Sequence, residues 1–184
     1  EYWLGEIDRF TNTSPTGESV PVDAAWQTAV NTAAAGQPVE GFDSVTNAHW
    51  VPFTFNYSLA VTDRVVAASL TLCMRSTAGG SSATLYLDAT NNAFNFASLG
   101  LSPITTSTNA SNATVRVLDL MAQTNLLADG KFNVAVAGDV GIDWALLQLE
   151  VAPSLSAGVF SLTPVADATV RGGASAASNF GNAA

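Results

Sequence analysis

The sequence predicts an all-β fold: a jelly-roll-like antiparallel β-sandwich with an N-terminal arm that contains a short helix. Of its 184 residues, 48% are hydrophobic and only 11% are charged, which suits neutral strands and turns better than charged helix surfaces. From Trp50 onward, hydrophobic residues recur at every second position. Turn-forming residues interrupt this pattern at intervals typical of a sandwich or jelly roll.

Residues 1–45 lack an alternating pattern and are predicted to form an irregular N-terminal arm or cap. Within them, residues 23–36 predict one short helix, with Asp23 as its N-cap and Gly36 as its C-cap. The hydrophobic residues of this segment would attach the arm to the sandwich.

The segment after Trp50 predicts two strands, over residues 51–61 and 64–76. In the second of them Leu70, Leu72 and Met74 fall on one face, and polar residues fall on the other. This alternation is typical of a strand with one buried face.

Further strands are predicted over residues 83–89 and 114–120, and a short helical or looped crossover is predicted over residues 119–131. A hairpin of residues 131–139 and 140–151 then closes the sandwich, with Gly138 and Asp139 in its turn. In the last strand the inward-facing residues are predicted to be Ala145, Leu147, Leu149 and Val151.

The composition divides the chain at the end of this hairpin. The sandwich is predicted over residues 46–151, and residues 152–163 have the Pro, Ser and Gly content of a linker. Residues 164–184 are predicted to be the first strand of a following, truncated domain.

Two segments resemble known groups of secreted proteins. Residues 40–151, which include "GFDSVTNAHWVPFTF" and "VGIDWALLQLEV", resemble a loosely defined group of secreted bacterial β-sandwich domains. The segment "ADATVRGGASAASNFG" resembles the opening of the DNRLRE-type domain, a jelly-roll module related to polysaccharide-binding modules. The matching positions are Asp167, Val170, Arg171, Gly172, Asn179, Phe180 and Gly181. These resemblances imply an extracellular or cell-surface location and an association with polysaccharide, and they transfer no catalytic residue.

The charge of the chain limits the partners that it could bind. The formal net charge is -9 and the chain has six Lys and Arg residues, so a basic surface for nucleic acid or anionic membranes is not expected. No apolar run approaches the roughly 18 residues of a membrane-spanning helix. The expected partners are a polysaccharide or cell-surface glycan and neighbouring domains of the same polypeptide.

The residues available for catalysis are few, and no catalytic residue is predicted. His49 is the only histidine and is predicted to be a hydrogen-bonded loop residue. Cys73 is the only cysteine, and its strand pattern predicts a small packed hydrophobic residue rather than a reactive thiol.

Asp139 and Asp143 form the one close carboxylate pair that the sequence singles out for chemistry. The pair could cap a turn, ligate calcium, or act as the acid and base of a glycosidase. The turn-capping interpretation is preferred, with calcium as the possible cofactor.

Aromatic side chains are the other candidate ligand contacts, because their flat faces stack on sugar rings. Tyr86 is predicted to share a polar strand face with Asp88, and Trp144 is predicted to lie opposite the inward face of its strand. The aromatic residues predicted to pack in the core or hold the arm are Trp3, Trp26 and Trp50.

Together these patterns predict a non-catalytic extracellular module that binds carbohydrate, or spaces and anchors a larger secreted protein. The alternative is a structural assembly or adhesion domain, in a filament or surface layer, that uses sheet edges and strand donation.

Overall fold

The computed structural model describes residues 1–8, 10, 17–44, 46–76, 83–89, 93–95 and 113–153. The chain divides into two units, Glu1–Ser154 and Leu155–Ala184. The second unit lies outside the described residues, together with the segment that resembles the DNRLRE-type domain. The predicted linker and truncated domain therefore stay predictions.

The described part of the first unit contains eight strands, one α-helix and one 3₁₀ helix. The strands are β1 (Tyr2–Gly5), β2 (His49–Asn56), β3 (Asp63–Ser76), β4 (Ala83–Leu87), β5 (Ala93–Asn95), β6 (Thr114–Asp119), β7 (Lys131–Gly138) and β8 (Val140–Pro153). The helices are α1 (Ala24–Ala34) and η2 (Met121–Leu127). None of the helices in these described ranges is long and apolar enough to cross a membrane.

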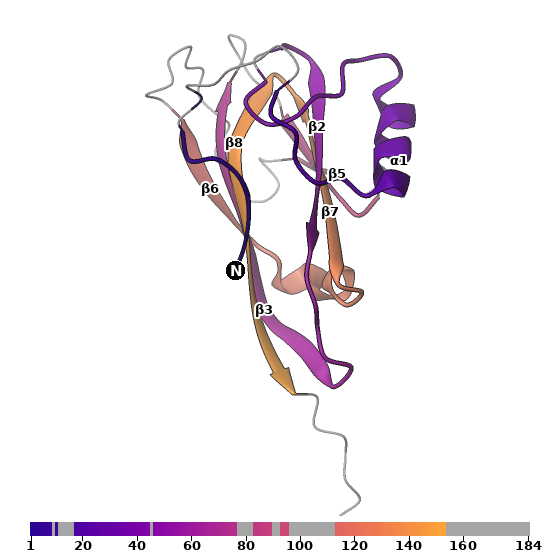
Figure 1. Ribbon diagram of the computed structural model, residues 1–184, viewed down its shortest axis with the longest axis vertical. Coiled ribbons are helices and arrows are strands. Elements are labelled where there is room, and N and C mark those ends of the chain that lie inside the picture. The colour runs from indigo at the N-terminus through magenta and orange to yellow at the C-terminus, as the bar shows by residue number, and fades with distance from the viewer. Residues whose placement is uncertain are drawn as a thin grey trace, which may run out of the picture. The chain divides into compact units, whose positions relative to one another are not determined.

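These strands form two four-stranded sheets, which we call the first and the second sheet. The first has the order β1-β8-β3-β6 and the second β2-β7-β4-β5, and the strand pairs are antiparallel. Successive strands alternate between the sheets except β4 and β5, which pair with each other in the second sheet, and this is the strand order of an eight-stranded jelly roll. The predicted β-sandwich is confirmed (Figure 1).

The main core lies between the two sheets and contains the residues that alternation predicted. Leu70, Leu72 and Met74 of β3 are buried there against Phe53 and Phe55 of β2. The two phenylalanine rings meet edge to face, with centroids 5.7 Å apart. Burial of these large apolar side chains is the main force that holds the sheets together.

The last strand follows the predicted pattern over only part of its length. Ala145 and Leu147 of β8 are fully buried, but Val151 is 44% exposed. β3 and β8 have 14 residues each, whereas β2 and β7 have eight. The C-terminal end of β8 therefore extends beyond the second sheet, which covers the rest of the strand. The prediction that Val151 points into the core is wrong for this reason.

Helix α1 packs on the outer face of the second sheet. Asp23 is its N-cap, as predicted, and Oδ1 of Asp23 accepts hydrogen bonds from the N–H groups of Ala25 and Trp26. The helix ends one residue earlier than predicted, because Ala35 and not Gly36 is the C-cap, with a φ of 50°. The apolar side of α1, Trp26, Val30 and Ala34, is buried against Trp50 and Ala135.

The first residues of the predicted irregular arm belong to the sandwich itself. Tyr2–Gly5 forms β1 at the edge of the first sheet, where Trp3 pairs with Leu146 of β8. A strand of four residues is too short for alternation to identify it. The remainder of the arm carries the predicted short helix.

His49 also differs from its predicted environment. It is the first residue of β2 rather than a loop residue, and it is 1% exposed. Burial lowers the pKa of the imidazole, and Glu40, the backbone of Thr46 and Asp139 oppose this shift.

Candidate functional site

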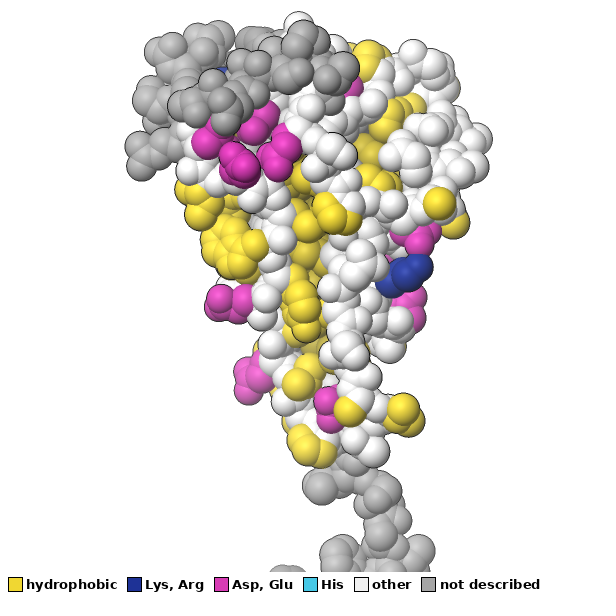
Figure 2. Space-filling view, in the orientation of Figure 1, with side chains coloured by type: hydrophobic (Ala, Val, Ile, Leu, Met, Phe, Trp, Pro, Cys, Tyr) yellow, Lys and Arg dark blue, Asp and Glu magenta, His cyan; other side chains and the backbone are white. Residues whose placement is uncertain are grey.

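Three carboxyl groups from distant parts of the chain meet at one end of the sandwich. Asp8 follows β1, Asp43 precedes β2, and Asp143 lies in β8; one oxygen of each lies within 4.8 Å of the others. Figure 2 shows exposed acidic side chains gathered in one group above a hydrophobic patch, whereas Asp43 and Asp143 themselves are buried. We call Asp8, Asp43 and Asp143, together with Glu18, the carboxylate cluster.

The backbone holds two members of the carboxylate cluster firmly. Asp143 is fully buried, and its Oδ1 accepts a hydrogen bond of 3.1 Å from the N–H of Phe10. The N–H of Asp43 donates to the carbonyl oxygen of Ile142 at 2.7 Å. Asp43 has a φ of 60°, an uncommon conformation for a residue with a side chain. This hydrogen bond to Ile142, the neighbour of Asp143, offsets part of the cost of the positive φ of Asp43.

Glu18 is brought to the cluster by a short antiparallel bridge. Glu18 and Phe42 pair through their backbones, which places Glu18 beside the neighbouring Asp43. Gly41 makes this approach possible, because a Cβ atom at Gly41 would lie 1.8 Å from the carbonyl oxygen of Glu18.

Several buried oxygens of the cluster lack hydrogen bonds. Oε2 of Glu18, Oδ1 of Asp43 and Oδ2 of Asp143 have no hydrogen-bond partner among the described residues. Burial without a partner destabilises a carboxylate strongly. Burial, followed by repulsion from Asp8, Asp143 and Glu18, raises the pKa of Asp43 to about 7, and Arg75 opposes this shift. Burial raises the pKa of Asp143 as well.

The donor set fits a hard divalent cation. Calcium takes oxygen ligands at about 2.3–2.6 Å, so two oxygens on one ion lie at most about 5 Å apart. The 4.8 Å limit on the separations of the oxygens of Asp8, Asp43 and Asp143 agrees with that geometry. A cation would also satisfy the buried oxygens that lack partners and remove the repulsion between the carboxylates.

The structure separates the two aspartates that the sequence paired. Asp143 belongs to the carboxylate cluster, whereas Oδ1 of Asp139 accepts a hydrogen bond of 2.7 Å from the N–H of Ala48. Asp139, which lies between β7 and β8, thus ties this turn to the segment before β2. Sequence reasoning missed Asp8, Asp43 and Glu18, because they meet only through the sheet and bridge pairings, and no local spacing reveals that.

Tyr86 has a packing role on the outer face of the second sheet. Its ring stacks on Trp50, with centroids 4.7 Å apart and an interplanar angle of 23°. It is half-buried against the cluster beneath α1. Because Trp50 occupies this face of the ring, a sugar could stack there only by displacing the indole.

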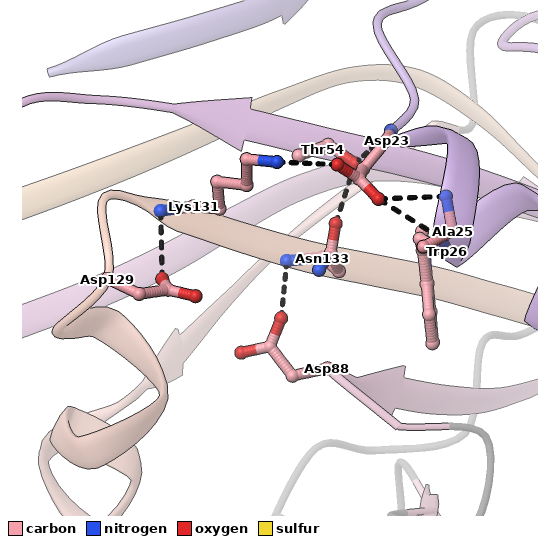
Figure 3. Close-up of polar contacts among 8 residues, drawn as sticks. All are labelled: Asp23, Ala25, Trp26, Thr54, Asp88, Asp129, Lys131 and Asn133. Atoms are coloured by element: carbon pink, nitrogen blue, oxygen red, sulfur yellow. Dashed lines mark hydrogen bonds and ion pairs between the residues drawn. The ribbon is translucent and has the colours of Figure 1, made fainter.

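Asp88 lies just past β4, in a network of polar contacts (Figure 3). Its Oδ1 accepts a hydrogen bond of 2.8 Å from the N–H of Asn133, whose Oδ1 accepts one from the hydroxyl of Thr54. Nearby, Lys131 forms an ion pair of 2.6 Å with Asp23. Burial raises the pKa of Asp88 to about 6. Asp88 lines a pocket of about 500 Å³ beside α1 and stays a predicted ligand contact.

Trp144 lies on the outer face of the first sheet, next to Trp3, for which the sequence predicts a place in the core or a role in holding the arm. Its indole and that of Trp3 lie 5.1 Å apart between centroids, at 47°. Trp3 is 46% exposed and so does not lie in the core, whereas the other role predicted for it, holding the arm to the sandwich, agrees with its pairing in β1. The pairing of β1 with β8 brings these two rings together.

Exposed hydrophobic residues also lie on the edge strand β6, separated from the indoles by the buried Cys73 and Thr71 of β3. Val115 and Val117 are 50% and 58% exposed. They pair with Cys73 and Thr71 of β3, which in turn pair with Trp144 and Leu146 of β8. We call Trp3, Trp144, Leu146, Val115 and Val117 the outer apolar face.

A pocket of about 450 Å³ with a mixed polar and apolar lining adjoins this face. Its lining residues are Glu1, Ala67, Ala68, Ser69, Asp119, Met121, Gln148, Leu149 and Glu150. Gln148 follows Leu146 on the same side of β8, and its Nε2 donates a hydrogen bond of 2.9 Å to Oε1 of Glu1. An aromatic pair and a hydrogen-bonding pocket therefore share one side of the sheet.

Comparisons with known proteins give weak structural similarities. No protein-family model matches the sequence, and no curated protein matches it. A CBM35 module in complex with a glucuronic-acid-containing disaccharide has a TM-score of 0.40 and 10% identity, over 83% of this chain and 92% of that one. The CBM35 of Cellvibrio japonicus Abf62 has a TM-score of 0.40 and 9% identity, over 83% and 93%. Latent apple tyrosinase has a TM-score of 0.38 and 12% identity, over 72% and 32%. The strand order of the two sheets, and not these similarities, establishes the jelly roll.

Proposed function

We propose that the chain is a non-catalytic extracellular module that binds carbohydrate on the outer apolar face. The observation that carries this proposal is the pair of indoles formed by the exposed Trp3 and the half-buried Trp144, beside a pocket of hydrogen-bonding side chains. Flat aromatic faces cover the apolar sides of sugar rings, and polar side chains nearby pair with the hydroxyl groups. A polysaccharide or cell-surface glycan is the proposed partner, and neighbouring domains of the same polypeptide would be its other contacts.

The burial of the carboxylate cluster favours a structural role over catalysis. A glycosidase holds its two carboxyl groups about 5–9.5 Å apart on either side of an accessible sugar. Here the side chains of Asp43 and Asp143 are 2% and 0% exposed, and their oxygens lie closer together than that range. A substrate would not reach between them, whereas a small ion would fit.

We therefore propose that the carboxylate cluster binds a structural calcium ion. The ion would link the chain after β1, the segment before β2, and β8, which are distant in sequence. Because an ion that binds only the folded state stabilises that state, calcium would hold together the end of the sandwich. Its proposed role is stability of the module, with no contact to the sugar.

A second candidate function is assembly or adhesion through the outer apolar face. Val115 and Val117 are exposed on β6, which is an edge strand of the first sheet in the described residues. Exposed apolar residues on an edge strand favour pairing with another chain. Self-association that Val117→Lys abolishes would support this candidate, and sedimentation that stays monomeric at high concentration would exclude it.

The test of carbohydrate binding is a polysaccharide panel measured by affinity electrophoresis and calorimetry. Trp3→Ala and Trp144→Ala should each weaken binding at least tenfold, because each removes a stacking surface. Val61→Ala is the control, since Val61 is an exposed hydrophobic residue outside this face. If no polysaccharide binds, or if both tryptophan variants bind like the wild type, the proposed function is wrong.

A further inference from the structure

The side chains on the outer side of β8 form one continuous line. Trp144, Leu146 and Gln148 alternate with Ala145 and Leu147 of the core, so all three lie on the outer side of β8, where Gln148 is exposed, Trp144 is half-buried and Leu146 is 9% exposed. At about 3.4 Å per residue, this line extends for about 14 Å. It begins at the indole pair and ends in the pocket beside Gln148, so it is long enough for several sugar rings in a row.

The charge of the pocket selects among saccharides. Three carboxylates line it, those of Glu1, Asp119 and Glu150, and none of the described lining residues is Lys or Arg. Carboxylate oxygens accept hydrogen bonds from hydroxyl groups, whereas they repel the carboxylate of a uronic acid. The net charge of -9 on the whole chain adds to that repulsion.

The other polar groups in the pocket complete a set suited to hydroxyl groups. Gln148 offers an amide, and the hydroxyl of Ser69 can donate and accept. Oδ1 of Asp119 already accepts a hydrogen bond of 2.8 Å from the N–H of Met121, which holds the carboxylate in place. A fixed acceptor orients a sugar hydroxyl with less loss of entropy than a mobile one.

From these observations we infer that the outer apolar face binds a neutral, linear polysaccharide that runs along β8, with sugar rings on Trp3 and Trp144 and hydroxyl groups in the pocket of Ser69, Gln148 and Asp119. This inference rests on the proposed function and names its ligand class. An acidic polysaccharide would place its carboxylates against those of Glu1 and Glu150.

The experiment compares two ligand series on the whole chain by calorimetry at low salt. Neutral oligosaccharides from xylan, glucan and mannan, one to six units long, are measured against oligogalacturonates of equal length. The expected result is that affinity for one neutral series rises at least tenfold from one ring to about three. The oligogalacturonates should bind at least tenfold more weakly. Equal or tighter binding of the oligogalacturonates would overturn the inference and leave the proposed function standing. Absence of binding by both series would overturn both.

A charge series at Glu150 tests the selectivity without touching the indoles. Glu150→Gln and Glu150→Lys should raise affinity for oligogalacturonate stepwise, by about threefold or more at each step, and change neutral affinity less than twofold. Asp129→Lys makes the same charge change beside β7 and lines a different pocket, so it controls for net charge. If Asp129→Lys has the same effect as Glu150→Lys, the pocket does not set the selectivity, and the inference is wrong.

Discussion

The carboxyl groups of Asp43 and Asp143 face each other inside the protein, each with one oxygen that has no hydrogen-bond partner among the described residues. Sequence positions 100 residues apart are brought together by the backbone hydrogen bond between Asp43 and Ile142. Both side chains are buried, so the repulsion between them is poorly screened by solvent. This relationship makes the stability of the fold depend on cations and on pH.

Calcium should stabilise the wild type, and Asp143→Asn should abolish this effect. At a calcium concentration 100 times the dissociation constant, the free energy of unfolding should rise by about 2.7 kcal/mol. Denaturant unfolding with calcium and with a chelator measures the difference. Asp139→Asn is the matched control, because the same substitution four residues away keeps an oxygen that can accept from Ala48. Loss of the calcium effect in Asp139→Asn, or its persistence in Asp143→Asn, would contradict the assignment.

Without calcium, the wild type should lose stability as the pH rises from about 4 to about 7. The pKa of Asp43 is raised from 3.8 to about 7, so the folded state takes up a proton in this window that the unfolded state does not. Asp43→Asn carries no proton to lose and should remove the part of this slope that Asp43 contributes, whereas Asp143 and Asp88, whose pKa values are also raised, keep theirs. The variant should be more stable than the metal-free wild type at pH 8. His49 acts in the opposite direction, since its lowered pKa favours unfolding in acid. The difference between the free energies of unfolding of the wild type and of Asp43→Asn, measured across this pH range, isolates the contribution of Asp43. Identical pH profiles would refute the prediction.

Gly41→Ala should damage the bridge that positions Glu18. The added methyl group would lie 1.8 Å from the carbonyl oxygen of Glu18, so the two backbone segments must separate. We expect a loss of about 1–3 kcal/mol in the free energy of unfolding, as for an overpacked site. Calcium affinity should fall in the same variant, as measured by titration calorimetry. A variant with wild-type stability and wild-type calcium affinity would show that this contact is unimportant.

The alternation of hydrophobic and polar residues predicted the strand faces that depend only on local sequence. The buried faces of β3 and of most of β8 followed from period two, and the N-cap Asp23 followed from its place before an apolar segment. The pattern could not reveal β1 or β5, which have four and three residues. Nor could it show that β8 extends beyond the second sheet, which leaves Val151 exposed.

The candidate site was less predictable, because its residues meet only through long-range pairing. Trp144 was identified from its strand face, but its partner Trp3 lies 141 positions earlier and joins it only when β1 pairs with β8. Asp143 was identified without Asp43, Asp8 and Glu18 for the same reason. A single sequence records the residue types of a site, whereas their convergence is a property of the fold.

Tyr86→Ala should weaken the fold and leave carbohydrate affinity unchanged. Removal of a fully buried aromatic side chain costs about 3–5 kcal/mol, so we expect about 2 kcal/mol for this half-buried ring stacked on Trp50. Tyr86→Phe keeps the stacked ring and should change the free energy of unfolding by less than about 1 kcal/mol. Denaturant unfolding and calorimetry with the bound polysaccharide measure the two effects. A folded Tyr86→Ala protein that has lost affinity would instead make Tyr86 a ligand contact.

The indole N–H signals of the four tryptophans test carbohydrate binding on the outer apolar face most directly. Nε1 of Trp26 donates to the carbonyl oxygen of Val134, and Nε1 of Trp50 donates to Oε1 of Gln37, so both belong to internal packing. In a two-dimensional NMR titration with a neutral oligosaccharide, the signals of Trp3 and Trp144 should shift while those of Trp26 and Trp50 stay in place. Shifts confined to Trp26 and Trp50, or no shift at saturating ligand, would contradict the proposed binding face.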